Sequence, residues 1–146
     1  MEQLIVGKSL EMQLAALLDT LPSDATVSYM VTRLNEGEEA TIVASSKETI
    51  VHTGASMVKT LILEYVFHLA AQEQLDLNDT IALSRSPRVE GAGALMELVG
   101  NHSFSYLELC RLMMVLSDNW ATNLLMQALG MENINARAEQ LGLEHF

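Results

Sequence analysis

The spacing of apolar residues predicts a helix and a β-hairpin in the N-terminal part of the chain. Apolar side chains recur at roughly helical spacing between residues 4 and 19, and Pro22 lies just beyond them. Residues 26–34 are rich in β-branched side chains and partly alternate between apolar and polar, as a half-buried strand does. The polar residues 35–39 predict a turn, after which residues 40–45 can return as a second strand.

From residue 56 onward the pattern predicts helices alone. Residues 56–73 are apolar at most positions, so we expect this helix to be buried on most of its faces. Residues 84–94 are rich in glycine, serine and arginine, which predicts a loop. Ser105 and Glu108 have the spacing of a capping box, which opens a helix. The helices expected after the loop span residues 105–116, 121–129 and 132–141.

Together these elements indicate an α+β fold. A mostly helical lobe, residues 51–146, follows an N-terminal helix and β-hairpin, residues 1–50. A single hairpin is marginally stable in water, and its outer strand presents unpaired backbone groups. We therefore expect further strands to cover the hairpin edge, and self-association is one source of such strands.

The composition and net charge of the chain argue against some classes of binding partner. The chain has 146 residues, with 8 Lys and Arg against 19 Asp and Glu, for a formal net charge of −11. This acidic balance argues against nucleic acid and against anionic membrane surfaces as partners. Apolar residues make up 49% of the chain and charged residues only 18%, against roughly 25% charged in a typical soluble domain. This composition excludes a disordered chain and indicates apolar surface in excess of what one small domain hides.

The sequence shows no membrane, export or metal signal. No apolar run is long enough to span a bilayer, and the N-terminus lacks the pattern of a signal peptide. As written the chain is expected to be cytoplasmic, or exported if a signal has been removed. Cys110 is the only cysteine, and the four histidines are far apart in the sequence. We therefore expect no disulfide, no metal site and no cofactor.

Ser56 and Lys59 are a candidate nucleophile and base. A spacing of three places both side chains on one helix face, and residues 53–55 suit a tight turn into that helix. In the first helical turn the macrodipole favours a developing alkoxide and disfavours a protonated lysine. A desolvated lysine can then take the proton of the serine hydroxyl. The pair is weak evidence alone, because such a spacing arises by chance about once in a chain of this length. Alone, it more often marks a capping serine beside a solvent-facing lysine.

A second candidate motif is Ser117-Asp118-Asn119, which lies in a break between two predicted helices. Taken alone, these three residues are also typical of an ordinary turn and helix N-cap. The two motifs together are more specific evidence for a catalytic site than either motif alone, because the secondary structure predicted around each motif also agrees with such a site.

With both motifs in place, the sequence resembles the class A β-lactamases and the related penicillin-recognising serine hydrolases. The resemblance runs from the hairpin to the end of the chain, and it implies about half of a β-lactamase-like fold. It is carried by residues 55–59 (the nucleophile motif), 91–93 (a Gly-Ser-Gly-like loop), 106–125 (the helix–SDN–helix), 133–137 and 141–143.

The resemblance also implies a role for each site residue. Ser56 is the acylated nucleophile, its backbone N–H is one oxyanion donor, and Lys59 is a general base or proton shuttle. Ser117 passes a proton to the leaving β-lactam nitrogen, since expulsion of nitrogen needs an acid nearby. Asn119 binds the side-chain amide of the substrate and helps to hold Lys59. Asp118 is expected to be structural, fixing its loop through backbone contacts.

Several parts of the family's domain have no counterpart in the sequence. These are the Ω-loop with the glutamate that activates the deacylating water, the strand bearing Lys-Thr-Gly, the remaining sheet strands and the terminal helix. A missing C-terminal half is therefore a second source of strands for the hairpin edge. No aromatic residue lies between Ser84 and Leu98, where many members keep one beside the site entrance, which leaves the substrate range open.

Three functions are consistent with these residues. The first is a serine hydrolase of the class A β-lactamase type, acylated at Ser56 by a β-lactam or a related ester or amide. The second is a catalytically incomplete remnant that serves as a dimerisation or interaction module. The third is a penicillin-binding protein that acylates without turnover.

Other notable side chains are expected to be structural. We assign Trp120, His68 and the methionines Met113, Met114 and Met126 to packing in the core, and Cys110 to an inert position on a buried helix face.

Overall fold

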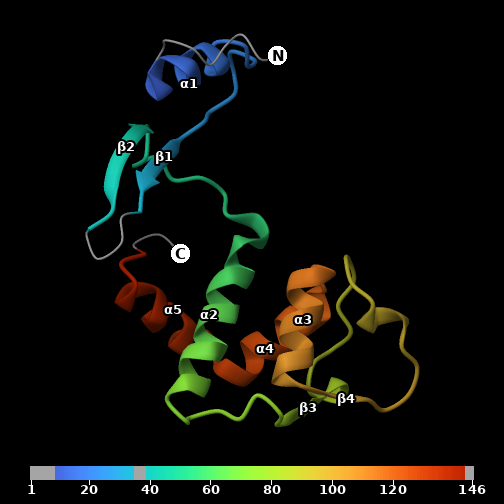
Figure 1. Ribbon diagram of the computed structural model, residues 1–146. Helices are drawn as coiled ribbons and strands as arrows, with labels where there is room; N and C mark the ends of the chain where they lie inside the picture. Colours follow the sequence, from blue (N-terminus) through green and yellow to red (C-terminus); the bar gives the residue numbers. More distant parts are fainter. Residues whose placement is uncertain (1–8, 35–38, 144–146) are drawn as a thin grey trace. The chain divides into compact units, whose positions relative to one another are not determined.

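The computed structural model describes residues 9–34 and 39–143 of the chain. It divides into two compact units, Met1–His52 and Thr53–Phe146. The first unit contains a helix and a two-stranded sheet, and the second contains the remaining helices with a second small sheet (Figure 1).

The first unit confirms the predicted helix and hairpin. Helix α1 spans Leu10–Leu18, and the Ser9 side chain caps it by accepting a hydrogen bond from the Met12 backbone N–H at 3.4 Å. Strands β1 (Tyr29–Arg33) and β2 (Thr41–Ser46) pair antiparallel. The start of the expected helix, before residue 9, and the turn residues 35–38 lie outside the described residues.

The first unit has little core of its own. Among its described residues only Ala44 is buried, and α1 has no buried residue. The apolar side chains of Met30 and Ile42 are more than half exposed, at 53% and 57%. Coverage of the hairpin edge by further strands stays a prediction.

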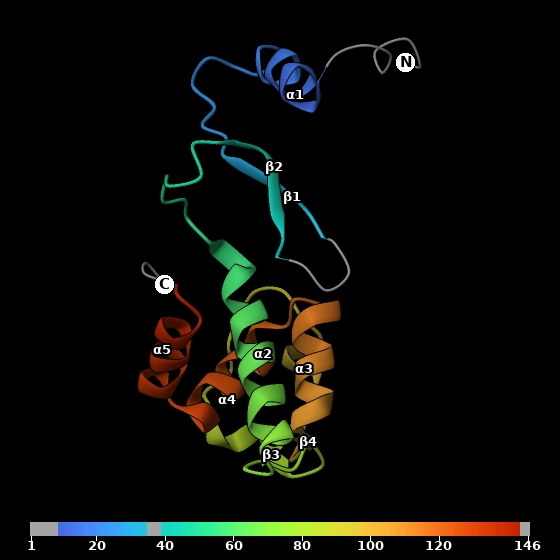
Figure 2. The ribbon, with the colours of Figure 1, turned by 60° about the vertical axis from the view of Figure 1, so that its left-hand side comes forward.

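Helix α2 is central to the second unit. A single 3-10 turn, Ala55–Met57, leads into α2, Val58–Ala71, which contacts α3, α4 and α5. Figure 2 shows α2 between α3 and α5. These three partners span Tyr106–Val115 (α3), Asn119–Leu129 (α4) and Met131–Gln140 (α5).

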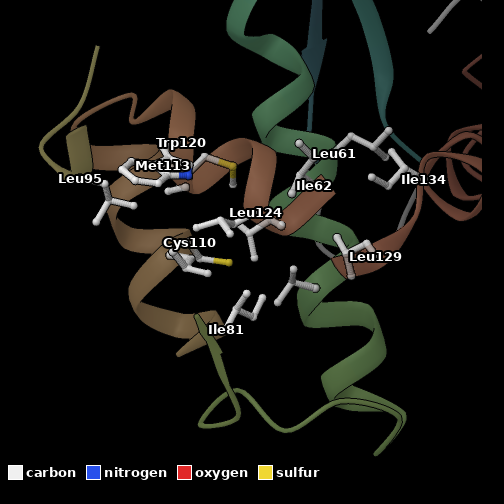
Figure 3. Close-up of a cluster of buried hydrophobic side chains, with 14 of the residues drawn as sticks. Leu61, Ile62, Ile81, Leu95, Cys110, Met113, Trp120, Leu124, Leu129 and Ile134 are labelled. Carbon is white, nitrogen blue, oxygen red and sulfur yellow. The ribbon is translucent and has the colours of Figure 1, made fainter. Parts of the chain in front are cut away.

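The hydrophobic core lies where these four helices meet (Figure 3). Each helix contributes fully buried side chains, and burial of this kind stabilises a helix more than its intrinsic propensity does. The largest of these side chains are Ile62 and Val66 from α2, Leu109 and Met113 from α3, Leu124 and Leu125 from α4, and Ile134 from α5.

Two predictions for this region were wrong. The chain after residue 56 is not helical throughout, because β3 (Thr80–Ala82) pairs antiparallel with β4 (Ser103–Ser105). Strands of three residues are too short to produce a readable alternation in the sequence. Helix α2 is also not buried on most faces. Of its fourteen residues only Lys59, Leu61, Ile62 and Val66 are buried, and Phe67 is 43% exposed.

The start of α3 confirms the predicted capping box. Ser105 is the N-cap residue, and its Oγ accepts a hydrogen bond from the Glu108 backbone N–H at 3.2 Å. In return, Glu108 Oε2 accepts one from the Ser105 backbone N–H at 2.8 Å. The hydrogen bonds that the Glu108 carboxylate accepts from the Ser105 backbone N–H and from the Ser105 hydroxyl hold the pKa of this carboxyl below its usual value. The two hydrogen bonds of the capping box satisfy backbone N–H groups that have no acceptor within the helix.

An ion pair connects α5 to α2. Arg137 donates through Nε to Glu64 Oε2 at 2.9 Å and through Nη2 to Glu64 Oε1. The paired hydrogen bonds from Arg137 hold the pKa of the Glu64 carboxyl below its ordinary value of 4.5. A carboxyl with a lowered pKa stabilises the fold above its unfolded-state pKa, and this stabilisation is lost as the pH falls through the lowered value.

We expect the Glu64→Gln variant to be less stable than the wild type at pH 7 by up to about 1 kcal/mol, because Glu64 is partly exposed and screened by water. At pH 3 the gap should be smaller. Urea unfolding at both pH values measures it. Glu139→Gln, on the exposed side of α5, is the control and should show no such pH-dependent gap. An equal gap at both pH values would contradict the assignment.

Candidate active site

Ser56 and Lys59 meet at the N-terminal end of α2. Ser56 lies in the 3-10 turn and is exposed, whereas the Lys59 side chain is buried, with 5% of its surface exposed. Lys59 Nζ lies 3.3 Å from Ser56 Oγ. Ala55, just before the serine, has a φ of 44°, a left-handed conformation that is strained for a residue with a Cβ. The backbone thus turns sharply at the residue that precedes the exposed Ser56.

The buried amine of Lys59 connects α2 to the turn between α3 and α4. Nζ lies 2.6 Å from Ser117 Oγ, 2.9 Å from the Ser117 carbonyl oxygen and 3.3 Å from Asn119 Oδ1. The structure therefore brings Ser56, Lys59, Ser117 and Asn119 together around one nitrogen atom. Ser117 also has a left-handed backbone, with a φ of 55°. Both hydroxyl groups near Lys59 thus lie at or next to a strained backbone position.

Asp118 organises the turn through backbone contacts, as expected. Its carboxylate is 1% exposed and caps α4, with Oδ1 accepting from the Ala121 N–H at 2.9 Å. The other oxygen, Oδ2, accepts from the N–H groups of Ala94 at 2.7 Å and Leu95 at 2.9 Å. One buried side chain therefore holds the end of the 84–94 loop against the start of α4.

The glycines of this loop allow its close approach to the turn. Gly91 and Gly93 have φ values of 118° and 131°, which L-residues with side chains rarely adopt. A Cβ on Gly93 would overlap the Asp118 carboxylate and come within 2.7 Å of its Cα, and one on Gly91 would overlap Asn119 Nδ2. The Asn119 backbone N–H also donates to the Ala92 carbonyl at 2.9 Å.

The loop contacts are the part of the site that residue patterns alone missed. The glycines stood out only through the resemblance, and nothing predicted which residues they would touch. The signal in the sequence was two glycines, Gly91 and Gly93, spaced by two within the predicted loop. Such spacing often marks a close approach of backbone, but it does not identify the partner.

Trp120 and Met113 pack as expected. Both are buried, and in Figure 3 they lie side by side near Leu95. Within the described residues, the indole Nε1 of Trp120 is buried with no hydrogen-bond partner. Met126 packs partly buried against the core, whereas Met114 is 43% exposed, so its assignment to the core was wrong. The prediction grouped Met114 with the adjacent Met113, but the two side chains face different sides of α3.

Cys110 is buried in the core as expected, whereas His68 is only partly buried and is not part of the core cluster. Burial raises the pKa of the Cys110 thiol to about 11, which keeps it protonated and unreactive at neutral pH. His68 is partly buried, and its ring stacks with that of Tyr65 at 6.4 Å between centroids.

Within residues 9–34 and 39–143, no cluster of three or more His, Cys, Asp or Glu side chains is arranged to hold a metal ion. Over the same ranges, no helix has the length and apolar content needed to cross a membrane.

Residues 9–146 match the family described as the beta-lactamase enzyme family. The chain belongs to this family. The match covers nearly the whole sequence and confirms the resemblance found from the two motifs. The solved relatives confirm the fold class as well, since structures of a β-lactamase and of PBP-A superpose on most of this chain.

Individual relatives include β-lactamases and penicillin-binding proteins. Beta-lactamase BRO-1 from Moraxella catarrhalis is 31% identical over 97 residues, which is 62% of this chain and 31% of that protein. A structure of PBP-A superposes with a TM-score of 0.69 at 25% identity, covering 92% of this chain and 49% of that one. A β-lactamase from Sphaerobacter thermophilus gives 0.65 at 25% identity, covering 79% and 41%.

A variant of PBP-A in an acyl-enzyme complex with penicillin G also matches, with a TM-score of 0.55 at 29% identity, over 62% of this chain and 35% of that one. The chain thus spans less than half the length of each of these relatives.

Proposed function

We propose that this chain carries the nucleophile side of the active site of a β-lactam-acting serine hydrolase of class A type, in its helical lobe, residues 51–146. Ser56 is the nucleophile, Lys59 the base, Ser117 a proton donor and Asn119 a contact for the substrate and for Lys59. The observation that carries the proposal is the position of the buried Lys59 amine, 3.3 Å from Ser56 Oγ and 2.6 Å from Ser117 Oγ.

The first chemical step is attack on the β-lactam carbonyl carbon. The neutral Lys59 amine takes the Ser56 hydroxyl proton as Oγ bonds to the carbon, and the carbonyl oxygen becomes an oxyanion. A neutral amine has two N–H donors and one lone pair. In this step its lone pair faces Ser56, and its two N–H groups are shared among the oxygen atoms of Ser117 and Asn119 that surround Nζ. The Ser56 backbone N–H, in a turn where such groups lack helical acceptors, is one donor to the oxyanion.

The second step breaks the carbon–nitrogen bond of the lactam. The carbonyl re-forms, and the leaving nitrogen takes a proton from the Ser117 hydroxyl. Lys59, now an ammonium group, replaces that proton across the 2.6 Å contact. Both side chains return to their starting protonation states, and Ser56 holds the acyl group.

The proposal is tested by intact-protein mass spectrometry of the 146-residue chain after incubation with excess penicillin G. We expect a mass increment of one penicillin on the wild type, and none on Ser56→Ala, because that variant lacks the nucleophilic oxygen. Ser84→Ala, at another exposed serine, is the matched control and should keep the increment. The proposal is overturned if the wild type shows neither the increment nor hydrolysed penicillin in solution.

Acylation without release is a second candidate, and the acyl-enzyme structure of the PBP-A variant favours it. The same experiment distinguishes the two functions. An increment that persists for hours supports a penicillin-binding protein, whereas rapid loss with accumulation of hydrolysed penicillin supports a β-lactamase.

A further inference from the structure

The carboxamide of Asn119 packs on a residue that has no side chain. A Cβ built on Gly91 would overlap Asn119 Nδ2 and lie 3.6 Å from its Cγ. The amide nitrogen of Asn119 thus occupies the space that any other L-residue at position 91 would need. At the other end of the same amide, Oδ1 lies 3.3 Å from Lys59 Nζ.

Simple chemistry fixes which end of the amide faces Lys59. The lysine nitrogen carries N–H donors, so it needs an acceptor, and only Oδ1 of the carboxamide accepts. The reversed orientation would set the Asn119 NH₂ group against those donors. The nitrogen end therefore faces Gly91 whenever the oxygen end faces Lys59.

We propose that Gly91 is a positioning residue that holds the Asn119 carboxamide with its oxygen on Lys59. This inference rests on the proposed function, in which Lys59 activates Ser56. Without a Cβ at position 91, the amide plane can extend from Lys59 to the loop backbone. With one, the amide rotates and Oδ1 leaves Lys59.

The surroundings leave the side chain of Asn119 as the group that must move. The loop is bound on both sides of Gly91: the Ala92 carbonyl accepts from the Asn119 backbone N–H at 2.9 Å, and Gln127 donates to the buried Ser86 hydroxyl at 3.2 Å. Asp118 also binds the backbone of the loop at residues 94 and 95. The steric clash caused by a methyl group on Gly91 therefore cannot be relieved by a movement of the loop unless these hydrogen bonds break.

Nuclear magnetic resonance on the wild-type chain tests the contact directly. The side-chain NH₂ signal of Asn119 is assigned by its loss in Asn119→Asp. We expect a nuclear Overhauser effect between these protons and the Gly91 Hα protons. Its absence overturns the proposal. Its presence in a chain that penicillin G does not acylate leaves the contact standing while the proposed function fails.

A double-mutant cycle then tests the consequence for the reaction. We expect Gly91→Ala to slow acylation of Ser56 by penicillin G about 10- to 100-fold, since small misplacements in a site cost this much. In the Asn119→Ala background, where no amide meets the new methyl group, the same change should alter the rate less than about twofold, because coupled residues are non-additive. An equal loss in both backgrounds overturns the proposal.

Gly100→Ala controls for backbone strain. Gly100 has a φ of 101°, like Gly91, but a Cβ there meets nothing closer than His102 Nε2 at 4.0 Å. This variant should match Gly91→Ala in its backbone strain while leaving the acylation rate within about twofold of the wild type. A loss equal to that of Gly91→Ala would assign the effect to strain and overturn the proposal.

Discussion

Replacing Lys59 with methionine is expected to slow the acylation of Ser56 by about a thousandfold, the range in which positioned general bases act. Methionine fills a similar volume in the buried site but has no group that accepts the proton of the Ser56 hydroxyl. Quenched-flow mass spectrometry with penicillin G measures the rate. Lys47→Met, at an exposed lysine, is the control and should react like the wild type.

The Lys59→Arg variant distinguishes the two possible roles of the lysine, which are to accept a proton and to donate hydrogen bonds. An arginine side chain still donates hydrogen bonds to Ser117 and Asn119, but its guanidinium does not lose a proton in proteins. If Lys59 is the base, this variant should be as slow as Lys59→Met. A rate within tenfold of the wild type in either variant would show that another group takes the proton.

Asp118→Ala is expected to cost about 3–5 kcal/mol of folding free energy, which is a large share of the stability of an ordinary domain. The substitution leaves the backbone N–H groups of Ala94, Leu95 and Ala121 without their acceptor, and α4 loses its N-cap. Urea unfolding measures the loss.

The matched control is Asp76→Ala. The Asp76 carboxylate also accepts a hydrogen bond from a backbone N–H, that of Asn78 at 2.8 Å, but on the exposed surface. Water can replace that bond, so the control should lose no more than about 1 kcal/mol. Comparable losses at the two positions would mean that the buried contacts of Asp118 add nothing.

Local signals predicted the parts of the structure that depend on neighbours in sequence. The capping box at Ser105 needs only residues three apart, and the hairpin needs only two strands and the turn between them. The spacing of Ser56 and Lys59 likewise depends on one helical turn, and the two side chains do lie in contact.

Features that depend on distant segments were harder to predict. The short strands β3 and β4 carry too few residues for a pattern, and they pair across a separation that the sequence does not reveal. Apolar residues lie on more sides of α2 than its neighbouring helices cover, so the prediction from composition overestimated how much of α2 is buried. The contacts of Gly91 and Gly93 with Asn119 and Asp118 join residues more than twenty positions apart, and no spacing rule connects them.

The buried indole of Trp120 gives the chain an optical reporter of its own. It is the only tryptophan in the sequence, and it directly follows Asn119 in the first turn of α4. Its fluorescence therefore comes from a single place, next to the turn that Asp118 holds. When that turn opens, the indole N–H gains water as a partner, and the emission shifts toward longer wavelengths. The integrity of the candidate site can thus be followed in solution without a label and without a substrate.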